Sequence, residues 1–462
     1  MSATRREFIR SSAMVGLGFL GLYKFSIANN IPSSEDVGYG PLLPDPKGIF
    51  NLPKGFTYQI ISKQGSTMSD GLLVPGKGDG MATFSAKNNR TIIIRNHENT
   101  HLDFKNGPFG KTNELLSKVD RKKFYDYGNG KNPGIGGTTT LIYNHTTKTV
   151  EKEFLSLIGT IRNCAGGPTP WNTWITCEET VERANQTLEK DHGYTFEVPA
   201  TDKGGIAEPL PIKGMGRFNH EAVAVDPKTG IVYLTEDDGE GLIYRFIPKT
   251  PSKLLQGGKL QALVFREQRS FDTRNWTGIS PNTMEAKRMF PVSWIDLEDI
   301  ESPRNDLRHR GFIKGAARFA RGEGMWYGND EVYFACTNGG SNKSGQVFKY
   351  RPSQFEGSPR EAEAPGALEL FAEPNNKDIL KYCDNLTVAP WGDLILSEDD
   401  DHPFLVGITP KGEYYKFGEN IGHRSELAGC VFSPDGSTLF VNIQHAGLTL
   451  AIEGPWIKGQ GK

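Results

Sequence analysis

Short apolar runs that end in four polar residues recur along the chain and predict β-strands. At residues 173–175 the sequence Thr-Trp-Ile alternates as a half-buried strand does, and Thr176, Cys177, Glu178 and Glu179 follow it. The same pattern occupies residues 92–98, 173–179, 232–238, 332–338, 394–400 and 439–445. Six copies indicate a structural repeat rather than chance.

Turn sequences accompany the copies. Residues 226–230 read Asp-Pro-Lys-Thr-Gly and residues 433–436 read Ser-Pro-Asp-Gly, and both are typical of tight turns between antiparallel strands. The unit is therefore strand, turn, strand with a polar end, glycine loop and strand. Its repetition without helical periodicity predicts an all-β fold, a six-bladed β-propeller. Residues 52–65 precede the first unit and are expected to complete the last blade, which would remove an exposed sheet edge.

The predicted domain plan has three parts. Residues 1–28 form a signal peptide, residues 29–50 a linker or N-terminal extension, and residues 51–455 a single propeller domain with insertions at about 99–135 and 249–320. Arg5, Arg6 and Phe8 stand before a mildly apolar segment at residues 11–25, which is typical of a twin-arginine export signal. The expected location is the periplasm or the outside of the cell, reached through the twin-arginine translocation machinery.

Composition excludes some classes of function. The formal net charge of −2 provides no basic surface for nucleic acid. The rest of the chain has no apolar stretch of about 18 residues, so no membrane span is expected in the mature protein. The five cysteines are too few and too widely spaced for a disulfide scaffold. We expect a monomer that acts on small molecules.

The upstream strands begin with a carboxylate, an amide or a thiol beside glycine, as in residues 78–80, 163–164, 322–324 and 383–385. Antiparallel pairing brings these starts close to the polar ends of the following strands, at one mouth of the channel. Carboxylates gathered there would repel and raise each other's pKa values, and multivalent cations would remove that cost. Oxygen ligands favour calcium, whereas a thiol favours a softer transition metal at one position.

Cys177 is interpreted as that thiol, with a small buried hydrophobe as the alternative. For Cys164, Cys383 and Cys430 a place in the core is favoured. No histidine pair has a metal-ligand spacing, so the motif histidines are equally candidates for supporting positions. Arg321 either pairs with carboxylates or binds a phosphate or other oxyanion, and its spacing leaves both roles open.

Seven motifs, in this order, resemble those of the PhoX-type alkaline phosphatase family. They are RNHEN (95–99), TCEE (176–179), RFNHEA (217–222), RGEGMWYG (321–328), APWGDLILSEDD (389–400), FSPDG (432–436) and LFVNIQH (439–445). The likeness runs from about Leu52 to His445. Two departures are the short chain and Ala446, where the family often has proline.

The resemblance implies a six-bladed propeller with a mixed Ca2+ and Fe3+ cluster that hydrolyses phosphomonoesters and releases inorganic phosphate. It implies a catalytic role for Arg321 and an iron ligand at Cys177. The implied metal ligands are Cys177, Glu98, Glu178, Glu221, Glu236, Glu323, Glu398 and Asp399. By their positions in the motifs, the candidate substrate-binding residues are Arg321, Asn96 and Asn338, and His97, His220 and Asp384 are placed around the metals.

Two other functions stay open. The same site would serve a phosphodiesterase or nucleotidase, because metal clusters stabilise both transition states. A calcium-stabilised propeller that only binds a partner is the non-enzymatic alternative. Such a structural calcium site needs neither the thiol nor the arginine, so Cys177, Arg321 and Glu323 together favour the enzyme.

Overall fold

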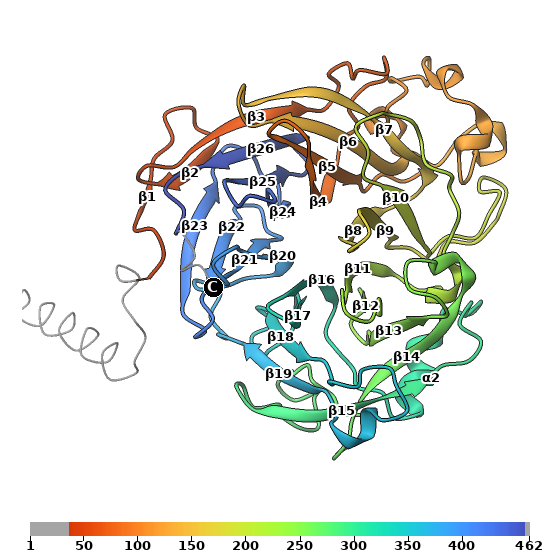
Figure 1. Cartoon of the computed structure of the whole chain (residues 1–462), viewed down its shortest axis with the longest axis vertical. Coiled ribbons are helices and arrows are strands. Elements are labelled where there is room, and N and C mark those ends of the chain that lie inside the picture. The colour runs from red at the N-terminus through yellow and green to blue at the C-terminus, as the bar shows by residue number, and fades with distance from the viewer. Residues whose placement is uncertain (1–36, 458–462) are drawn as a thin grey trace, which may run out of the picture.

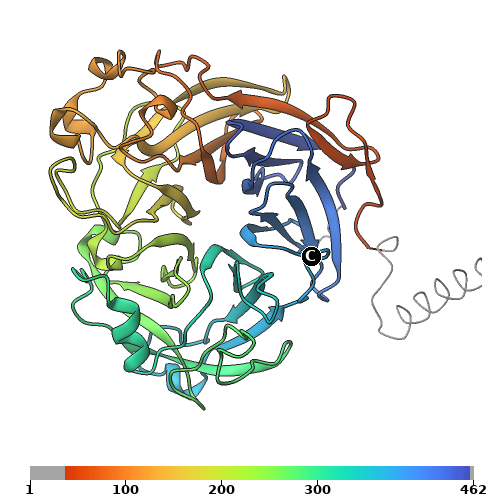
Figure 2. The same cartoon turned by 180° about the vertical axis from the view of Figure 1, so that it is seen from behind.

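The computed structural model describes residues 37–457. The predicted signal peptide at residues 1–28 lies outside the described residues. Figure 1 shows antiparallel sheets arranged around a central axis, in chain order, and Figure 2 shows the same ring from behind. Among the described residues, no helix is long and apolar enough to cross a bilayer.

Five sheets make up the ring. In hydrogen-bonded order, two of them are β4 (Gly78–Ala86), β5 (Arg90–His97), β6 (Gly136–Asn144) and β7 (Thr149–Thr160), and then β8 (Asn163–Pro168), β9 (Thr173–Glu178) and β10 (Thr195–Pro199). The largest contains β11 (His220–Val225), β12 (Val232–Glu236), β13 (Ile243–Pro248), β14 (Gly258–Phe265), β15 (Met289–Asp296), β19 (Ala367–Ala372), β18 (Gln346–Arg351), β17 (Glu331–Cys336) and β16 (Gly322–Gly328).

The last two sheets bring the two ends of the described chain together. One contains β20 (Cys383–Val388), β21 (Leu394–Glu398), β22 (Phe404–Ile408), β23 (Tyr414–Asn420), β2 (Phe50–Pro53) and β1 (Leu42–Leu43). The other contains β24 (Leu427–Phe432), β25 (Thr438–Ile443), β26 (Leu448–Glu453) and β3 (Thr57–Lys63). The pairing of β3 with β26 closes the ring, as the sequence predicts for residues 52–65.

Within residues 37–457, helices are few and short. They are α2 (Leu307–Ile313) and the 3-10 turns η1 (Phe104–Asn106), η2 (Leu116–Lys118), η3 (Arg121–Lys123), η4 (Gly128–Gly130), η5 (Lys213–Met215), η6 (Leu254–Gln256) and η7 (Glu361–Glu363). The fold is therefore all-β and propeller-like, as predicted.

Six inner strands form the central ring. β4, β8, β11, β16, β20 and β24 contact one another in that cyclic order, and β24 returns to β4. They lie nearest the axis in Figure 1. Because β15 pairs with β19, two runs of strands merge into the nine-stranded sheet, and the sheets number five.

Neighbouring sheets are held face to face by apolar side chains, which explains why most strands are buried on both faces. β12, for example, is buried along its whole length, with Val232 and Leu234 on one side and Tyr233 on the other. The turn before it is set by Asp226, whose carboxylate accepts a hydrogen bond from Lys228 N at 2.9 Å, and by Gly230 at φ 72°.

The chain departs from the predicted insertion at residues 249–320. β14 and β15 lie within it and extend the sheet beyond β13, so much of this segment is regular structure. The charges and turn residues of this segment do not indicate these strands, and the first two residues of β14 are exposed whereas the other six are buried. Residues 99–135 contain turns but no strand, and Phe109 and Phe124 pack them against β7.

Candidate functional site

Acidic side chains converge where the inner strands begin. They line a cavity of about 120 Å3. The residues around it are Asp79, Glu98, Arg162, Cys164, Glu179, Glu221, Asp237, Arg321, Glu323, Asp384, Asp399, Glu426 and Gln444. We call this cavity the acidic pocket. Nine carboxylates face two guanidinium groups in it, so opposite charge within the chain balances only part of the anionic wall.

A repeated backbone irregularity turns one set of side chains into the pocket. In β11, His220 pairs with Glu236 and Val223 with Leu234, so this strand has one residue more than its partner between the two pairs. The same shift occurs in β4, β8, β16 and β20. Such a β-bulge bends the strand and re-aims a side chain. A sixth shift of this kind occurs in β24, and the other five bulges contain Asp79, Cys164, Glu221, Glu323 and Asp384.

The second set comes from the residues directly after the second strand of each unit. Glu98, Glu179, Asp237, Asp399 and Gln444 follow β5, β9, β12, β21 and β25. All five line the acidic pocket. Pairing places the end of each second strand beside the bulge of the first strand, so the two sets meet as the sequence predicts.

Glu178, the last residue of β9, lies outside the pocket that its neighbour Glu179 lines. Its carboxylate accepts hydrogen bonds from Gly193 N at 2.9 Å and Tyr194 N at 3.2 Å, and from Ile161 N at 3.1 Å. Glu178 therefore fastens the next strand instead of facing the cavity. A step of one residue along a strand turns the side chain to the opposite face.

Glu236 and Glu398 repeat this arrangement. Glu236 accepts hydrogen bonds from Leu242 N at 3.2 Å and Tyr244 Oη at 2.6 Å, and burial raises its pKa to about 7. Glu398 accepts from Lys381 N at 2.9 Å and Phe404 N at 3.0 Å. The predicted positions of Glu178, Glu236 and Glu398 in the site are thus corrected by one residue, to Glu179, Asp237 and Asp399.

The two cysteines exchange their predicted places. Cys177 is buried in the apolar cluster around Ile175 and Leu234, and burial raises the pKa of its thiol. Cys164 lines the pocket, and its Sγ lies within 4.8 Å of carboxylate oxygens of Glu179 and Glu221. The bulge in β8 turns Cys164 inward, so the thiol that lies among the pocket carboxylates is that of Cys164, although it is also buried, and not the predicted Cys177.

The predicted amide site residues also lie outside the pocket. Asn96 donates from Nδ2 to the carbonyl oxygens of Cys164 at 3.0 Å and Ala165 at 2.7 Å, so it fixes the backbone of β8 behind the thiol. Asn338 accepts a hydrogen bond from Trp276 Nε1 at its backbone oxygen, at 2.7 Å. Neither lines the cavity, and their contact with a substrate stays a prediction.

The two predicted histidines are buried. A ring nitrogen of His97 lies 2.9 Å from Gly76 O, and a ring nitrogen of His220 lies 3.1 Å from Gly216 O. Burial lowers the pKa of both, to about 3 for His220, so both are neutral at ordinary pH. Asp384, predicted as a supporting residue, lines the pocket itself.

Arg321 bridges two pocket carboxylates. It donates from Nε and Nη2 to the two oxygens of Asp237, each at 2.8 Å, and from Nη2 to Glu323 at 2.6 Å. Glu323, and then Asp237 and Asp384, raise its pKa. The backbone of Arg321 has φ 52°, a left-handed value that is costly for a non-glycine residue and concentrates at functional sites.

Arg162 occupies the corresponding place before β8. Its φ is 50°; Nε and Nη2 donate to Glu98 at 3.1 and 3.0 Å, and Nη2 also contacts Glu179. Although burial opposes it, Glu179 and Glu98 raise the pKa of this guanidinium. Arg162 was not predicted as a site residue, but its spacing of two residues before Cys164 matches that of Arg321 before Glu323.

Desolvation and mutual repulsion dominate the pocket. Burial, followed by the charge of neighbouring carboxylates, raises the pKa of Glu221 and of Asp384 well above the usual range. The same two causes act on Asp79 and Glu426. The buried Oδ1 of Asp79 has no hydrogen-bond partner in the described part of the chain. Bound cations would satisfy both the unused oxygen and the excess negative charge.

Two groups of side chains bring their donor atoms close enough to hold a metal ion. One is Cys164, Glu179 and Glu221, and the other is Glu221, Glu323 and Asp384, each with its ligand atoms within 4.8 Å of one another. Glu221 belongs to both. One group mixes a thiol with oxygens and the other has oxygens alone, which corresponds to a softer and a harder cation.

Of the predicted residues, Glu98, Glu221, Arg321, Glu323, Asp384 and Asp399 line the pocket, and their chemical roles stay predictions. The analysis of the sequence did not assign Asp79, Arg162, Cys164, Glu179, Asp237, Glu426 and Gln444 to the site. Asp79 and Cys164 were recognisable, because both stand beside glycine or a polar residue at the start of an inner strand. Nothing in the spacing indicates Glu426, which precedes its strand.

Comparisons with known proteins agree with this geometry. A family model described as alkaline phosphatase PhoX matches residues 37–447. PhoX from Pseudomonas fluorescens, solved in complex with vanadate, a transition state analogue, superposes with a TM-score of 0.63 at 18% identity, covering 88% of this chain and 96% of that one.

A second solved structure is more distant. XC5397 from Xanthomonas campestris, a gluconolactonase, gives a TM-score of 0.40 at 12% identity, covering 91% of this chain and 99% of that one. A comparison with curated protein sequences gives no match.

Proposed function

The chain belongs to the PhoX family of alkaline phosphatases, and we propose that its acidic pocket is where phosphate monoesters are hydrolysed. The observation that carries this assignment is the meeting of nine carboxylates, a thiol and two arginines in one cavity of about 120 Å3. A cavity of that size suits one phosphoryl group, with the leaving group outside. This favours a monoesterase over the phosphodiesterase or nucleotidase alternative.

Metal ions are part of the proposal. The pocket fits Ca2+ at its all-carboxylate side and Fe3+ beside Cys164, because carboxylate oxygens suit hard cations and a thiolate suits a transition metal. Glu221 would contact both kinds of ion. When bound, such ions supply Lewis-acid activation of water and positive charge for phosphoryl oxygens. Metal binding would also lower the pKa values that burial raises, and so keep the carboxylates ionised.

Arg321 and Arg162 would bind the phosphoryl group. A guanidinium presents two parallel donors that match two phosphate oxygens, and phosphoryl transfer depends mainly on positioning and charge stabilisation. Both arginines are now held by pairs of carboxylates. These ion pairs fix the direction of both guanidinium groups. They also offset the free-energy cost of the left-handed backbone at both arginines.

Desolvation strengthens each of these interactions. The pocket carboxylates Glu221 and Glu323 are almost fully buried, and charges interact more strongly in such surroundings than in water. The two arginines are the more exposed members, at 39% for the Arg162 side chain and 35% for Arg321. They therefore stand where a phosphate ester would enter, with the carboxylates behind them.

The test is a combined assay of metal content and substrate class. Protein purified without chelator should contain calcium and iron and should hydrolyse p-nitrophenyl phosphate much faster than bis-p-nitrophenyl phosphate. Removing the metals should abolish the activity, and restoring them should recover it. Zinc as the sole bound metal would refute the proposed cations. Preferential cleavage of the diester would refute the monoesterase, and a metal-loaded protein inactive on both esters would favour the binding protein.

We also propose that the ring has six blades, each beginning with one of the inner strands β4, β8, β11, β16, β20 and β24. Their cyclic contacts support this number, and the nine-stranded sheet is then two blades joined at β15 and β19. Six bulged strands, with register shifts in each, are what a sixfold repeat would produce. An experimental structure that placed two of these strands in one blade would contradict it.

Export remains a proposal that rests on the sequence alone. Arg5 and Arg6 before an apolar segment predict passage through the twin-arginine machinery to the periplasm or beyond, and a metal-loaded protein would benefit because this route carries folded proteins. A replacement of both arginines by lysine should leave active protein in the cytoplasm. Unchanged export would refute the assignment. A monomer is expected, and sedimentation at several concentrations tests it.

A further inference from the structure

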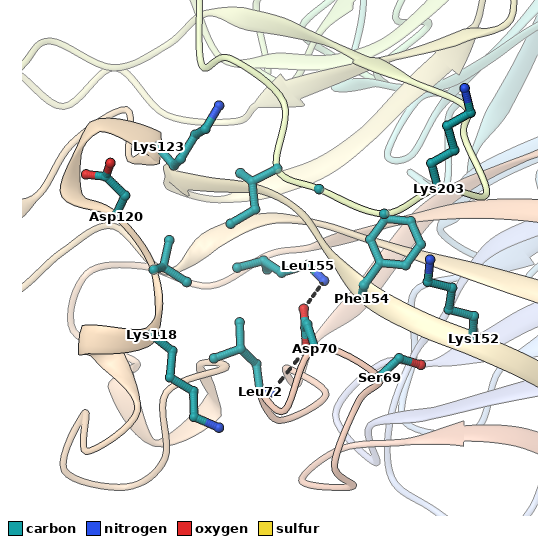
Figure 3. A pocket seen from close by; sticks show the side chains of 14 residues that line it. Ser69, Asp70, Leu72, Lys118, Asp120, Lys123, Lys152, Phe154, Leu155 and Lys203 are labelled. Atoms are coloured by element: carbon teal, nitrogen blue, oxygen red, sulfur yellow. Dashed lines mark hydrogen bonds between the residues drawn. The ribbon is translucent and has the colours of Figure 1, made fainter.

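A second cavity lies on the outside of the ring against β7. Its volume is about 420 Å3, within the range of small-molecule sites, and it shares no lining residue with the acidic pocket. Four segments form its walls: residues 69–72, 118–123, 152–155 and 203–206. We call it the lateral pocket, and Figure 3 shows it from close by.

The lateral pocket has an apolar floor and a cationic rim. Leu72, Phe154, Leu155 and Ile206 supply apolar surface. Around them stand four lysines: Lys118, Lys123, Lys152 and Lys203. In Figure 3 Lys118 and Lys123 lie on one side of this floor, while Lys152 and Lys203 lie on the other. A molecule on the floor would therefore be flanked by ammonium groups.

Two carboxylates within the pocket offset part of the charge of this rim, but neither forms an ion pair with a rim lysine. Asp70 accepts hydrogen bonds from Leu72 N at 3.0 Å and Leu155 N at 2.8 Å, and Asp120 accepts from Lys122 N at 3.0 Å. Both carboxylates therefore accept hydrogen bonds from backbone amides. Lys123 pairs with Glu208.

The other three lysines have no carboxylate partner in the part of the chain that the structure describes. Lys118 Nζ donates to Gly71 O at 2.8 Å and Lys152 Nζ to Asp202 O at 3.0 Å. A carbonyl oxygen orients an ammonium group but leaves its charge unbalanced. An excess of positive charge therefore remains around an apolar surface.

The glycine wall adds donors at the same place. Gly204 and Gly205 line the cavity with φ values of 87° and 103°. A Cβ at Gly204 would lie 3.3 Å from Lys152 Nζ, so the ammonium group lies against bare backbone. Within residues 37–457 the amide groups of Gly204 and Gly205 have no hydrogen-bond partner. An anion near Lys152 would meet these backbone donors as well.

We propose that the lateral pocket is a binding site, separate from catalysis, for a small organic anion with an apolar body. Its acidic group would bind Lys152 and Lys203 beside the glycine wall, and its apolar body would cover Leu155 and Ile206. Apolar contact supplies affinity, and the lysines supply selectivity for negative charge. A neutral molecule of the same shape would leave the ammonium groups unbalanced and would bind less tightly.

The probe is 8-anilinonaphthalene-1-sulfonate, whose fluorescence rises in apolar surroundings. Titrated into the folded protein, it should bind at one saturable site and be displaced by decane-1-sulfonate, an anion that a phosphatase cannot hydrolyse. The double variant Lys152→Glu/Lys203→Glu should weaken this binding at least about tenfold. Turnover of p-nitrophenyl phosphate should be unchanged, because neither lysine touches the acidic pocket.

Lys54→Glu/Lys87→Glu is the matched control, since both lysines are exposed, lie outside the cavity and form no ion pair in the described chain. It changes the net charge equally and should bind the probe as the parent does. If the glutamate variant fails to fold, Lys152→Gln/Lys203→Gln replaces it. The proposal is overturned if probe binding is equal in parent and variant, or if neutral N-phenyl-1-naphthylamine binds as tightly. Loss of turnover in the variant overturns the separation from catalysis.

Discussion

Two sets of carboxylates stand one residue apart at the same strand ends, and they differ in their hydrogen-bond partners and surroundings although their chemistry is the same. The outer ring consists of Glu178, Glu236 and Glu398. These side chains are buried and accept hydrogen bonds from backbone amides near the start of the next strand. The inner ring is Glu179, Asp237 and Asp399, whose side chains line the acidic pocket. A carboxylate with several amide donors stabilises the fold, whereas one surrounded by other carboxylates needs a cation. Position along a strand end decides between the two roles.

The first prediction has the largest expected effect on turnover. It changes Glu221, which lines the acidic pocket together with the inner ring. Glu221→Gln should lower phosphatase turnover by at least about a thousandfold, roughly 4 kcal/mol, because Glu221 belongs to both candidate metal groups. The metal-free variant should unfold at a higher temperature than the metal-free parent, since one repelling carboxylate is gone. Turnover and thermal unfolding are measured on the same preparations.

The outer ring supplies the control. Glu178→Gln should destabilise the fold by about 3 kcal/mol, because a buried charge that pairs with His192 and accepts amide hydrogen bonds is lost. Its folded fraction should retain bound metal. A metal-free Glu221→Gln protein less stable than its parent would contradict the difference between the rings.

The second prediction concerns pH and the outer ring. His192 lies between Glu178 and Asp126, at 2.6 and 3.2 Å, and despite burial these carboxylates raise its pKa from 6.5 to about 9. A raised pKa in the folded state gives stability that is complete below the unfolded value and is lost as pH rises through about 9. The unfolding free energy of the parent should exceed that of His192→Gln most below pH 6.5.

That difference should shrink by up to about 3 kcal/mol towards pH 10, and denaturant titrations at several pH values measure it. His402→Gln, at an exposed position, should show no such trend. A difference that is constant with pH would mean that the pKa of His192 is the same in the folded and the unfolded protein.

The third prediction compares the two cysteines. Cys164→Ser should lower turnover about a hundredfold and reduce bound iron, because Cys164 Sγ lies with Glu179 and Glu221 in one candidate metal group. Cys177→Ser should keep its iron and its turnover but lose about 1–2 kcal/mol of stability, since a hydroxyl would be buried in an apolar cluster. Iron per chain and thermal unfolding distinguish them. The reverse result would restore the assignment made from the TCEE motif.

The sequence predicts the repeat and the ring closure but not the side-chain directions at the centre. Residues 92–98 and 232–238 carry a recognisable period, so the strands and their pairing follow from it. The six bulges are invisible in that period, because each adds one residue between paired positions. Cys177 and Glu178 were predicted from the polar end of their strand and from the TCEE motif, neither of which reports the bulge in β8. Tertiary packing of β8 against its neighbours decides instead for Cys164 and Glu179.

The family motif misplaced the thiol for a related reason. Cys164 and Cys177 lie in adjacent strands, with Asn163 paired to Glu178, so both are near the same end of the sheet. The two cysteines differ in the face of the sheet on which their side chains lie, since Cys164 lines the acidic pocket and Cys177 lies in an apolar cluster. By contrast, Arg321 and Glu323 both line the acidic pocket, although Arg321 has a left-handed backbone and Glu323 lies within the bulge of β16.

The smallest predicted effect concerns Arg321, which pairs with Asp237 of the inner ring. Arg321→Lys should keep the metals but lower turnover at least about tenfold, roughly 1.4 kcal/mol. Lysine preserves the charge that pairs with Asp237 and Glu323, yet it lacks the planar fork that contacts both oxygens of Asp237 and would contact two phosphate oxygens. Arg318→Lys is the control, since Arg318 pairs with Glu240 at 3.0 Å and lies outside the acidic pocket. Rates on p-nitrophenyl phosphate, with metal content checked in parallel, measure both variants. Equal rates for Arg321→Lys and the parent would leave Arg321 as an ion-pair partner of the carboxylates and would assign the phosphoryl group to Arg162 or to the cations.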